Sequence, residues 1–130
     1  KTHYNEMNVL SMHALIGAYQ PQGYEWVDEL NQVLADNIEY FCNYVDEHFE
    51  GVSYSRPQGT YMVFLDCTEW CREHGRDIQW LLDAGARVGV GYQDGRPFHG
   101  PCHIRVNLAL PLSRVREACD RLDHYVFNAR

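Results

Sequence analysis

The sequence predicts an α+β fold: a small, mostly antiparallel sheet covered by helices, with a long N-terminal connecting helix. Three observations lead to this fold class. One long segment repeats apolar residues at the helical period, two later segments have strand patterns, and an amphipathic helical pattern closes the chain. The length of 130 residues suits one domain that builds its own core.

Two helices are expected before any strand. Residues 8–19 are apolar around most of a helical circumference, which is typical of a helix that is buried on several sides. Pro21 and Gly23 are expected to interrupt the chain there. Residues 25–49 then follow the helical period, and Gly51 ends this long amphipathic helix. Its apolar residues are Trp26, Leu30, Val33, Leu34, Ile38, Phe41, Cys42 and Val45.

The middle of the chain is expected to alternate short strands and short helices. Residues 52–54 suit a short strand, and residues 61–66 suit a buried strand because five apolar residues follow one another. Residues 69–74 and 78–82 are expected to be helical, and Asp77 is expected to cap the second helix.

The next segment is expected to be largely irregular. Gly85 is expected to end the second short helix, and residues 87–90 to form another short strand. Residues 91–101 are rich in Gly and Pro and are expected to form a loop.

Residues 103–109 have the clearest strand pattern. Ile104, Val106 and Leu108 share one face, whereas Arg105 and Asn107 share the other. A final amphipathic helix opens at Pro111 and Ser113 and extends to Val126. We divide the chain into a connecting helical segment, residues 1–22, and a small C-terminal domain, residues 23–130.

The bulk properties disfavour several classes of partner. A net charge of −7 leaves no basic footprint for nucleic acid or for an acidic lipid surface. The longest apolar stretches are too short to span a bilayer, and no secretory signal opens the sequence. The five cysteines are odd in number and lie in apolar surroundings, which indicates reduced thiols. We therefore expect a cytoplasmic protein without a membrane or nucleic-acid partner.

A zinc-binding structural domain is an alternative to weigh. Zinc prefers four nitrogen or sulfur ligands in tetrahedral array. Candidate ligands are Cys67, Cys71, His74, Cys102 and His103. No C-x-x-C pair is present, and Cys67 ends an apolar strand where cysteine is commonly a core residue, so no metal ligand is assigned.

Arg105 is the most informative polar residue. It stands in mid-strand between apolar neighbours, and because an isolated charge is costly to bury, it must reach solvent or meet an anion. One interpretation is an edge-strand arginine on a solvated face. The other is a carboxylate clamp, since guanidinium binds carboxylate with two parallel hydrogen bonds.

Several motifs resemble one family of enzymes. Residues 104–111 read IRVNLALP before an amphipathic helix, and they resemble the C-terminal end of class I/II aminotransferases, pyridoxal-phosphate enzymes of fold type I. Residues 56–61 read RPQGTY and match the family's P-x-G-[TA]-[FY] pattern. Residues 17–19, with Gly23, Trp26, Leu30 and Asn37, resemble the branch of cystathionine β-lyase and related C–S lyases. Residues 98–103 depart from it, because that branch is more glycine-rich there.

The resemblance implies the small domain of a pyridoxal-phosphate-dependent C–S β-lyase or aminotransferase that acts on amino acids. Arg105 maps onto the arginine that grips the substrate α-carboxylate. The cofactor, pyridoxal 5′-phosphate, and its lysine belong to the family's large domain, so no catalytic or cofactor-binding residue is assigned here. Lys1 is the only lysine, and the chain alone is therefore expected to be inactive.

Two further expectations follow from this assignment. The first helix is expected to pack on the large domain or on a partner subunit of a homodimer, because Met12, Leu15, Ile16 and Tyr19 would otherwise expose an apolar patch. A different class of function stays open: a non-catalytic effector domain that only holds an amino acid.

Overall fold

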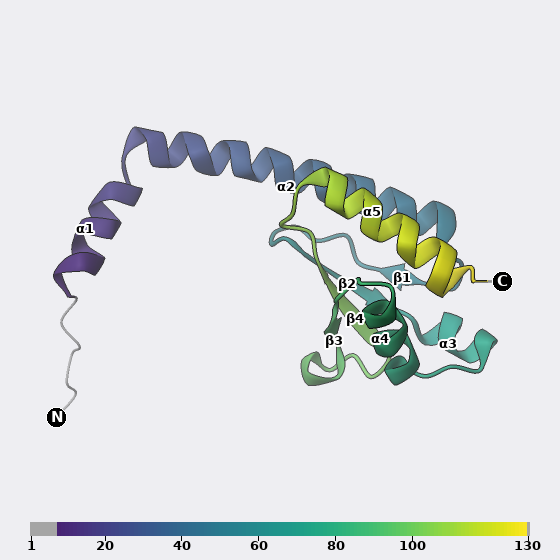
Figure 1. The fold of residues 1–130 in the computed structure, drawn as a ribbon. Coiled ribbons are helices and arrows are strands. Elements are labelled where there is room, and N and C mark those ends of the chain that lie inside the picture. The colour runs from purple at the N-terminus through teal and green to yellow at the C-terminus, as the bar shows by residue number, and fades with distance from the viewer. Residues whose placement is uncertain (1–7, 130) are drawn as a thin grey trace, which may run out of the picture. The chain divides into compact units, whose positions relative to one another are not determined.

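The computed structural model describes residues 8–129, which divide into one unit that ends at Val33 and a second that begins at Leu34. Figure 1 shows the elements along the chain. They are α1 (Val9–Ala18), α2 (Pro21–His48), β1 (Ser53–Tyr54), β2 (Met62–Asp66), α3 (Thr68–His74), α4 (Ile78–Arg87), β3 (Gln93–Asp94), the 3-10 helix η1 (Arg96–Phe98), β4 (His103–Asn107), α5 (Leu112–Leu122) and the π-helical turn η2 (Asp123–Phe127). The predicted boundary between residues 22 and 23 stays a prediction.

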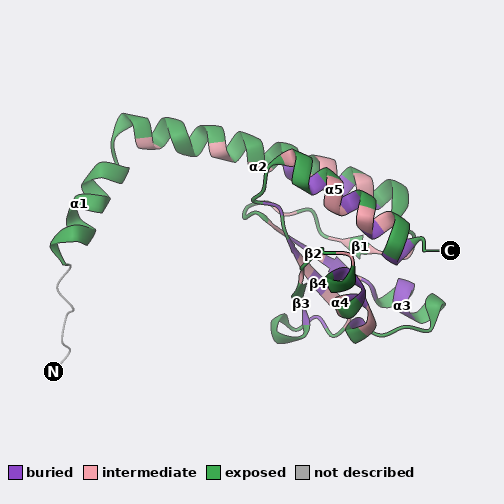
Figure 2. Cartoon of the chain, in the orientation of Figure 1, coloured by how far each residue is buried: buried purple, intermediate pink, exposed green. Residues whose placement is uncertain are grey.

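Helix α1 forms where the apolar pattern predicts it. The Asn8 side chain caps it by accepting a hydrogen bond of 2.9 Å from the Ser11 N–H. Figure 2 shows this helix exposed along its whole length, and none of its residues is buried within the described chain. The burial that its composition predicts for this helix therefore stays a prediction.

The start of α2 corrects the predicted interruption at Pro21 and Gly23. The helix begins at Pro21 and not at Glu25. Proline suits the first helical position, because the N–H that it lacks has no partner within a helix there. Gly23 fits because a Cβ atom would lie 2.0 Å from the Ala18 carbonyl oxygen. The longest helix, α2, has 28 residues, and no helix of the described residues is both long and apolar enough to cross a membrane.

The four strands form one antiparallel sheet in the order β1-β2-β4-β3. The two inner strands, β2 and β4, pair so that Val63 lies opposite Val106 and Phe64 opposite Arg105. Burial alternates along both strands, with Val63, Leu65, Ile104 and Val106 on the buried face. The other face, which carries Phe64 and Arg105, stays partly open, as the alternation along residues 103–109 predicts.

Helices supply the rest of the core on the buried side of the sheet. Figure 1 shows α5 beside the second half of α2, and both helices contribute buried residues. The core includes Phe41, Cys42, Val45, Trp70, Leu81, Val115, Cys119, Leu122 and Phe127. The chain is therefore an α+β protein with a small antiparallel sheet covered by helices, which confirms the predicted fold class.

Residues 85–94 differ from the prediction. Helix α4 continues past Gly85 to Arg87, so the strand predicted at residues 87–90 is wrong, and the short strand β3 forms later, at Gln93–Asp94. A turn ends α4, because the N–H of Val90 donates to the Gly85 carbonyl oxygen over 2.9 Å. Gly85 is needed within the helix for packing, since a Cβ atom would lie 2.5 Å from the Tyr92 ring.

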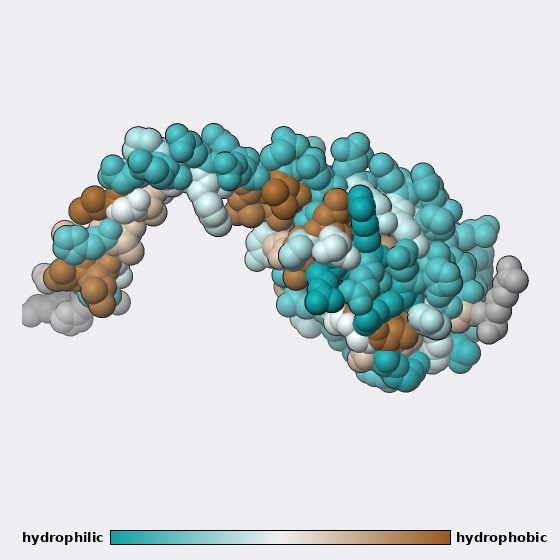
Figure 3. Space-filling view, turned by 45° about the horizontal axis from the view of Figure 1, so that its top comes forward, coloured by the Kyte–Doolittle hydropathy of each residue, from teal (hydrophilic) through white to brown (hydrophobic). Residues whose placement is uncertain are grey.

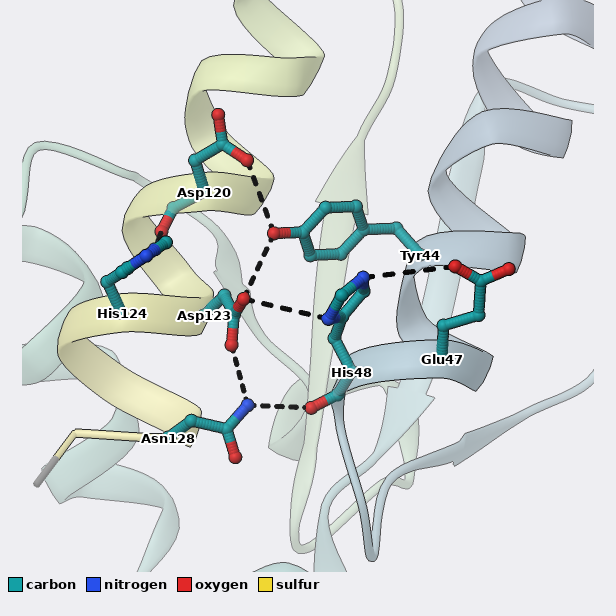
Figure 4. Close-up of polar contacts among 7 residues, drawn as sticks. All are labelled: Tyr44, Glu47, His48, Asp120, Asp123, His124 and Asn128. Carbon is teal, nitrogen blue, oxygen red and sulfur yellow. Dashed lines mark hydrogen bonds and ion pairs between the residues drawn. The ribbon is translucent and has the colours of Figure 1, made fainter.

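A polar cluster fastens the end of α2 to α5 and η2 (Figure 4). The Tyr44 hydroxyl lies 3.2 Å from a carboxylate oxygen of Asp120 and of Asp123, and it donates to one at a time because it carries a single proton. The Asn128 amide donates to the His48 carbonyl over 2.7 Å and to Asp123 over 2.6 Å. Burial and the nearby Asp123 carboxylate raise the pKa of Tyr44, so the donor stays protonated.

Candidate functional site

Arg105 lies on an inner strand of the sheet. Strand β4 is flanked by β2 and β3, and Arg105 pairs with Phe64 on one side and with Gln93 on the other. The interpretation of Arg105 as an edge-strand residue is therefore wrong. Its side chain is half-buried and projects from the partly open face, opposite to Ile104 and Val106.

The guanidinium of Arg105 rests on an aromatic ring. Its Cζ atom lies 4.0 Å from the centroid of Phe98, within the range of a cation–π contact. The arginine ion pairs found within residues 8–129 are those of Arg72, Arg96, Arg114 and Arg121, and none involves Arg105. The site therefore offers a half-buried guanidinium whose N–H groups are suited to an incoming carboxylate.

Sequence reasoning did not single out Phe98. Phe98 lies in residues 98–103, where the sequence departs from the pattern of the family that it resembles. The fold of the loop that contains Phe98 places its ring over Arg105. Phe98 is 47% exposed, which is unusual for a phenylalanine next to a packed sheet. An exposed aromatic residue in a short turn before the key strand was the available signal.

Two neighbours of this site, Asp66 and His103, serve to fix local structure. The Asp66 carboxylate accepts hydrogen bonds of 2.9 Å from the Thr68 N–H and 2.5 Å from the Thr68 hydroxyl. Burial would raise the pKa of Asp66, but these bonds, together with the nearby His103, outweigh it and lower the pKa. The centroids of the His103 and Phe64 rings are 4.6 Å apart. The His103 Nε2 atom lies 3.8 Å from a carboxylate oxygen of Asp66. Asp66 is thus engaged in the start of α3.

The residues considered as zinc ligands differ in burial: Cys67 and Cys71 belong to the core, Cys102 and His103 are partly buried, and His74 is exposed. Cys67 and Cys71 are buried, and the Cys67 N–H donates to the Cys102 carbonyl over 2.9 Å. Burial raises the pKa of the Cys71 thiol to about 12. The His74 ring stacks on Trp70 with 4.4 Å between centroids. Within residues 8–129, no group of three or more His, Cys, Asp or Glu residues is arranged to hold a metal ion.

Asn37 secures the chain just after β4. Its side chain is buried, and its amide donates to the carbonyl oxygens of Leu108 over 2.9 Å and of Leu110 over 2.8 Å. This segment connects β4, the strand that bears Arg105, to the first turn of α5. Asn37 was noted for the family resemblance, and in the structure its role is to anchor that connection.

A cavity of about 340 Å³ lies at the end of β4, beside the start of α5. Its lining combines core residues with the polar side chains of Arg114, Glu117 and Arg121. Val106 and Leu108, which point away from the Arg105 face, form part of its wall. Asn107, which shares the Arg105 face of the strand, also contributes to the lining, whereas Arg105 does not.

Sequence comparison identifies relatives of this chain. No protein-family model matches it. A Mycobacterium leprae protein that bears the provisional name of a cystathionine β-lyase is 33% identical over 124 residues, which cover 83% of this chain and 30% of that protein. Protein MalY of Escherichia coli K12 is 30% identical over 112 residues, which cover 85% of this chain and 28% of MalY. The chain thus spans about a third of the length of these relatives.

Comparison with solved structures finds proteins with the same fold. The pyridoxal-phosphate-bound C–S lyase of Staphylococcus hominis superposes with a TM-score of 0.83 at 23% identity, over 98% of this chain and 34% of that structure. At this identity the likeness establishes the fold, and the sequence relatives establish the branch. The chain is therefore a relative of the cystathionine β-lyase and MalY proteins, and it corresponds to the C-terminal part of pyridoxal-phosphate-dependent enzymes of fold type I.

Proposed function

We propose that this chain is the substrate-carboxylate-binding domain of a pyridoxal-phosphate-dependent enzyme that acts on amino acids, with C–S β-elimination as the favoured reaction and transamination as the second. The observation that carries the proposal is Arg105, a half-buried arginine on an inner strand with no acidic partner among residues 8–129. The names of the relatives support elimination over transamination.

The donor set of this site fits an amino-acid carboxylate. A guanidinium binds a carboxylate through two parallel N–H···O bonds, which fix both the position and the plane of the bound group. By holding the carboxylate, Arg105 would orient the bonds at the substrate Cα. Pyridoxal phosphate supplies an electron sink for the negative charge that develops at this carbon. The partly open face of β4 would then look into the cleft between this domain and the rest of the enzyme.

The cofactor itself would be held by the part of the enzyme that lies outside this chain. A cofactor lysine is required for attachment and proton transfer, and the only lysine here is Lys1, which lies outside the described residues. We therefore propose that the chain alone is inactive. Treatment with pyridoxal phosphate and borohydride should leave no stoichiometric adduct other than at the N-terminal residue, and turnover of cystathionine by the chain alone would contradict this proposal.

Helix α1 is proposed to form an interface in the complete enzyme, either with the large domain or with a partner subunit of a homodimer. Figure 3 shows apolar atoms gathered over this helix, and its large hydrophobic residues are about half or more exposed. Exposed apolar patches of this kind mark interaction surfaces. The five unpaired cysteines also support a cytoplasmic enzyme.

Substitution of Arg105 in the complete enzyme tests the proposed function. Arg105→Ala should lower kcat/KM by roughly two to three powers of ten, because the substrate carboxylate would lose its charge-assisted hydrogen bonds. Cofactor binding, followed by absorbance, should be retained. Arg105→Lys should restore only part of the activity, since an ammonium group cannot form the two-pronged contact. Normal kinetics for Arg105→Ala would overturn the carboxylate-clamp assignment.

A further inference from the structure

We propose that Phe98 is a positioning residue for Arg105, and that its ring holds the guanidinium in the orientation that receives the substrate carboxylate. This inference rests on the proposed function of Arg105 and adds a second residue to the site. The contact that carries it is the stack of the guanidinium on the Phe98 ring, with 4.0 Å from Cζ to the ring centroid.

The stack and the carboxylate would use different parts of the guanidinium. The guanidinium carbon lies over the ring, 4.0 Å from its centroid, and in our proposal the planar group rests on the ring by one face. The N–H donors point outward in that plane, where a carboxylate binds with two parallel hydrogen bonds. The two contacts therefore do not compete, and the ring can stay in place while the substrate binds.

The side chain of Arg105 needs such a restraint. Arginine has several rotatable bonds, and ordering it upon substrate binding costs conformational entropy. No ion pair to a carboxylate of residues 8–129 fixes the guanidinium. Its strand neighbours are Phe64 and Gln93, which lie beside it and leave the end of the side chain to Phe98. A guanidinium already ordered by the ring would bind a carboxylate with a smaller entropic cost.

The loop that carries Phe98 is fastened to β4. The Gly95 N–H donates to the His103 carbonyl over 2.8 Å, and the Gly100 N–H donates to the Gly95 carbonyl over 3.1 Å. A Cβ atom at Gly95 would lie 2.4 Å from the His103 carbonyl oxygen, and one at Gly100 would lie 2.5 Å from the Phe64 ring. Only glycine allows the loop to approach this closely, so the fold delivers Phe98 to the open face of the strand.

The loop is also braced on its outer side. The Arg96 side chain donates to Asp94 over 2.7 Å and to Gln79 over 3.0 Å, and its backbone N–H donates to Asp94 over 2.9 Å. Phe98 thus stands at the end of a short, well-anchored turn. A ring that is 47% exposed in such a turn is explained by its contact with Arg105 and not by core packing.

The test uses the complete enzyme with its cofactor. Phe98→Leu should raise KM for the amino-acid substrate by about 3- to 30-fold, the range expected for loss of a partly desolvated cation–π contact, while kcat changes much less. Phe98→Met, which keeps apolar volume without a ring, should behave like Phe98→Leu. Phe98→Tyr should stay close to the natural enzyme because it keeps the ring. Tyr125→Leu, at an exposed aromatic residue outside the site, is the control and should leave KM unchanged.

Two comparisons separate a positioning role from a structural one. A competitive inhibitor that retains the carboxylate should bind the Phe98→Leu variant more weakly than it binds the natural enzyme. An analogue without the carboxylate should bind the variant and the natural enzyme equally well. In the Arg105→Ala background, Phe98→Leu should add less than about a 2-fold effect, since the two residues act through one contact. An undiminished effect in that background, equal losses for both inhibitors, or an unchanged KM in Phe98→Leu would overturn the inference.

The outcomes also distinguish this inference from the proposed function. If Arg105→Ala lowers kcat/KM strongly and Phe98→Leu has no effect, the carboxylate clamp stands and the role of Phe98 is wrong. If Arg105→Ala itself leaves the kinetics normal, the proposed function fails, whatever the Phe98 variants do.

Discussion

At the scale of single residues, neighbouring positions of β4 combine a structural role with the functional role that we propose for Arg105. Ile104 and Val106 are buried in the core, whereas Arg105 between them is half-buried and stacked on Phe98. Because side chains alternate across a strand, a residue that serves the core and one that serves a ligand can be immediate neighbours. Substitution of Arg105 should therefore affect catalysis in the complete enzyme with little effect on the folding of this domain.

Asn37 provides a stability prediction at this scale. Among the described residues it is the one buried polar side chain, and its amide satisfies the Leu108 and Leu110 carbonyl oxygens. Asn37→Ala would leave the buried Leu108 carbonyl and the partly buried Leu110 carbonyl without this donor, and we expect the free energy of unfolding to fall by about 1–3 kcal/mol. Urea denaturation of the chain measures this change. Asn43→Ala, the same substitution at an exposed position of α2, is the control, and equal effects at the two positions would argue against the anchoring role.

At the scale of elements, the helices differ in where their apolar residues go. The second half of α2 buries Phe41, Cys42 and Val45 against the sheet and α5, as its amphipathic pattern predicts. Helix α1 has no buried residue among those described, although its composition is at least as apolar. The second half of α2 is also held by polar contacts, because hydrogen bonds of the cluster around Tyr44 and Asp123 join its end to the end of α5 and to η2 (Figure 4).

Helix α1 therefore leads to a prediction about association. The chain alone should form dimers or larger species as its concentration rises, because an exposed apolar helix favours self-association. Light scattering measures the mass. A double variant, Leu10→Gln with Ile16→Gln, should shift the equilibrium toward monomer, since both side chains are more than half exposed. Ser11→Gln on the same helix is the control, and a chain that stays monomeric at high concentration would contradict the proposed interface.

At the scale of the whole molecule, burial favours the neutral form of several cysteine thiols and tyrosine hydroxyls. Burial raises the pKa of Cys119 and of Cys71 to about 12, and it raises the pKa values of Cys67, Tyr54 and Tyr92 as well. A group whose pKa is raised in the folded state contributes stability that is fully present below its unfolded pKa. That contribution is lost as the pH rises toward the folded pKa.

The chain should accordingly lose stability in mild alkali. The loss should begin near pH 9, the ordinary pKa of a thiol, and continue toward pH 12. Each thiol that is ionised only in the unfolded state contributes about 1.4 kcal/mol per pH unit to this slope. Cys119→Ala should reduce the slope by about that amount, as measured by urea denaturation at successive pH values. A slope that is the same with and without Cys119 would mean that this thiol does not contribute.

The interior of the fold could be predicted from local patterns. The alternation of residues 103–109 and the helical period of the second half of α2 both report which side chains are buried, and the structure confirms those faces. The first half of α2 differs from the prediction, because Trp26 and Val33 are half or more exposed. The other errors fall at residues 85–94 and at Pro21, where the local signal was a glycine or a proline. Gly85 was interpreted as a helix stop, but it serves packing against Tyr92, and Pro21 starts a helix. A glycine or proline has more than one physical use, and only its neighbours in space decide between them.

The sequence by itself determined the fold class, the two faces of β4 and, through its resemblance, the family and the singling out of Arg105. The tertiary structure alone decided that β4 is an inner strand and that the Phe98 ring covers the Arg105 guanidinium. The physical reason is the range of the interactions. Periodicity reports the burial of a face within one element, whereas strand order and the course of the 95–100 loop depend on hydrogen bonds and close contacts between distant segments, such as Gly100 against Phe64.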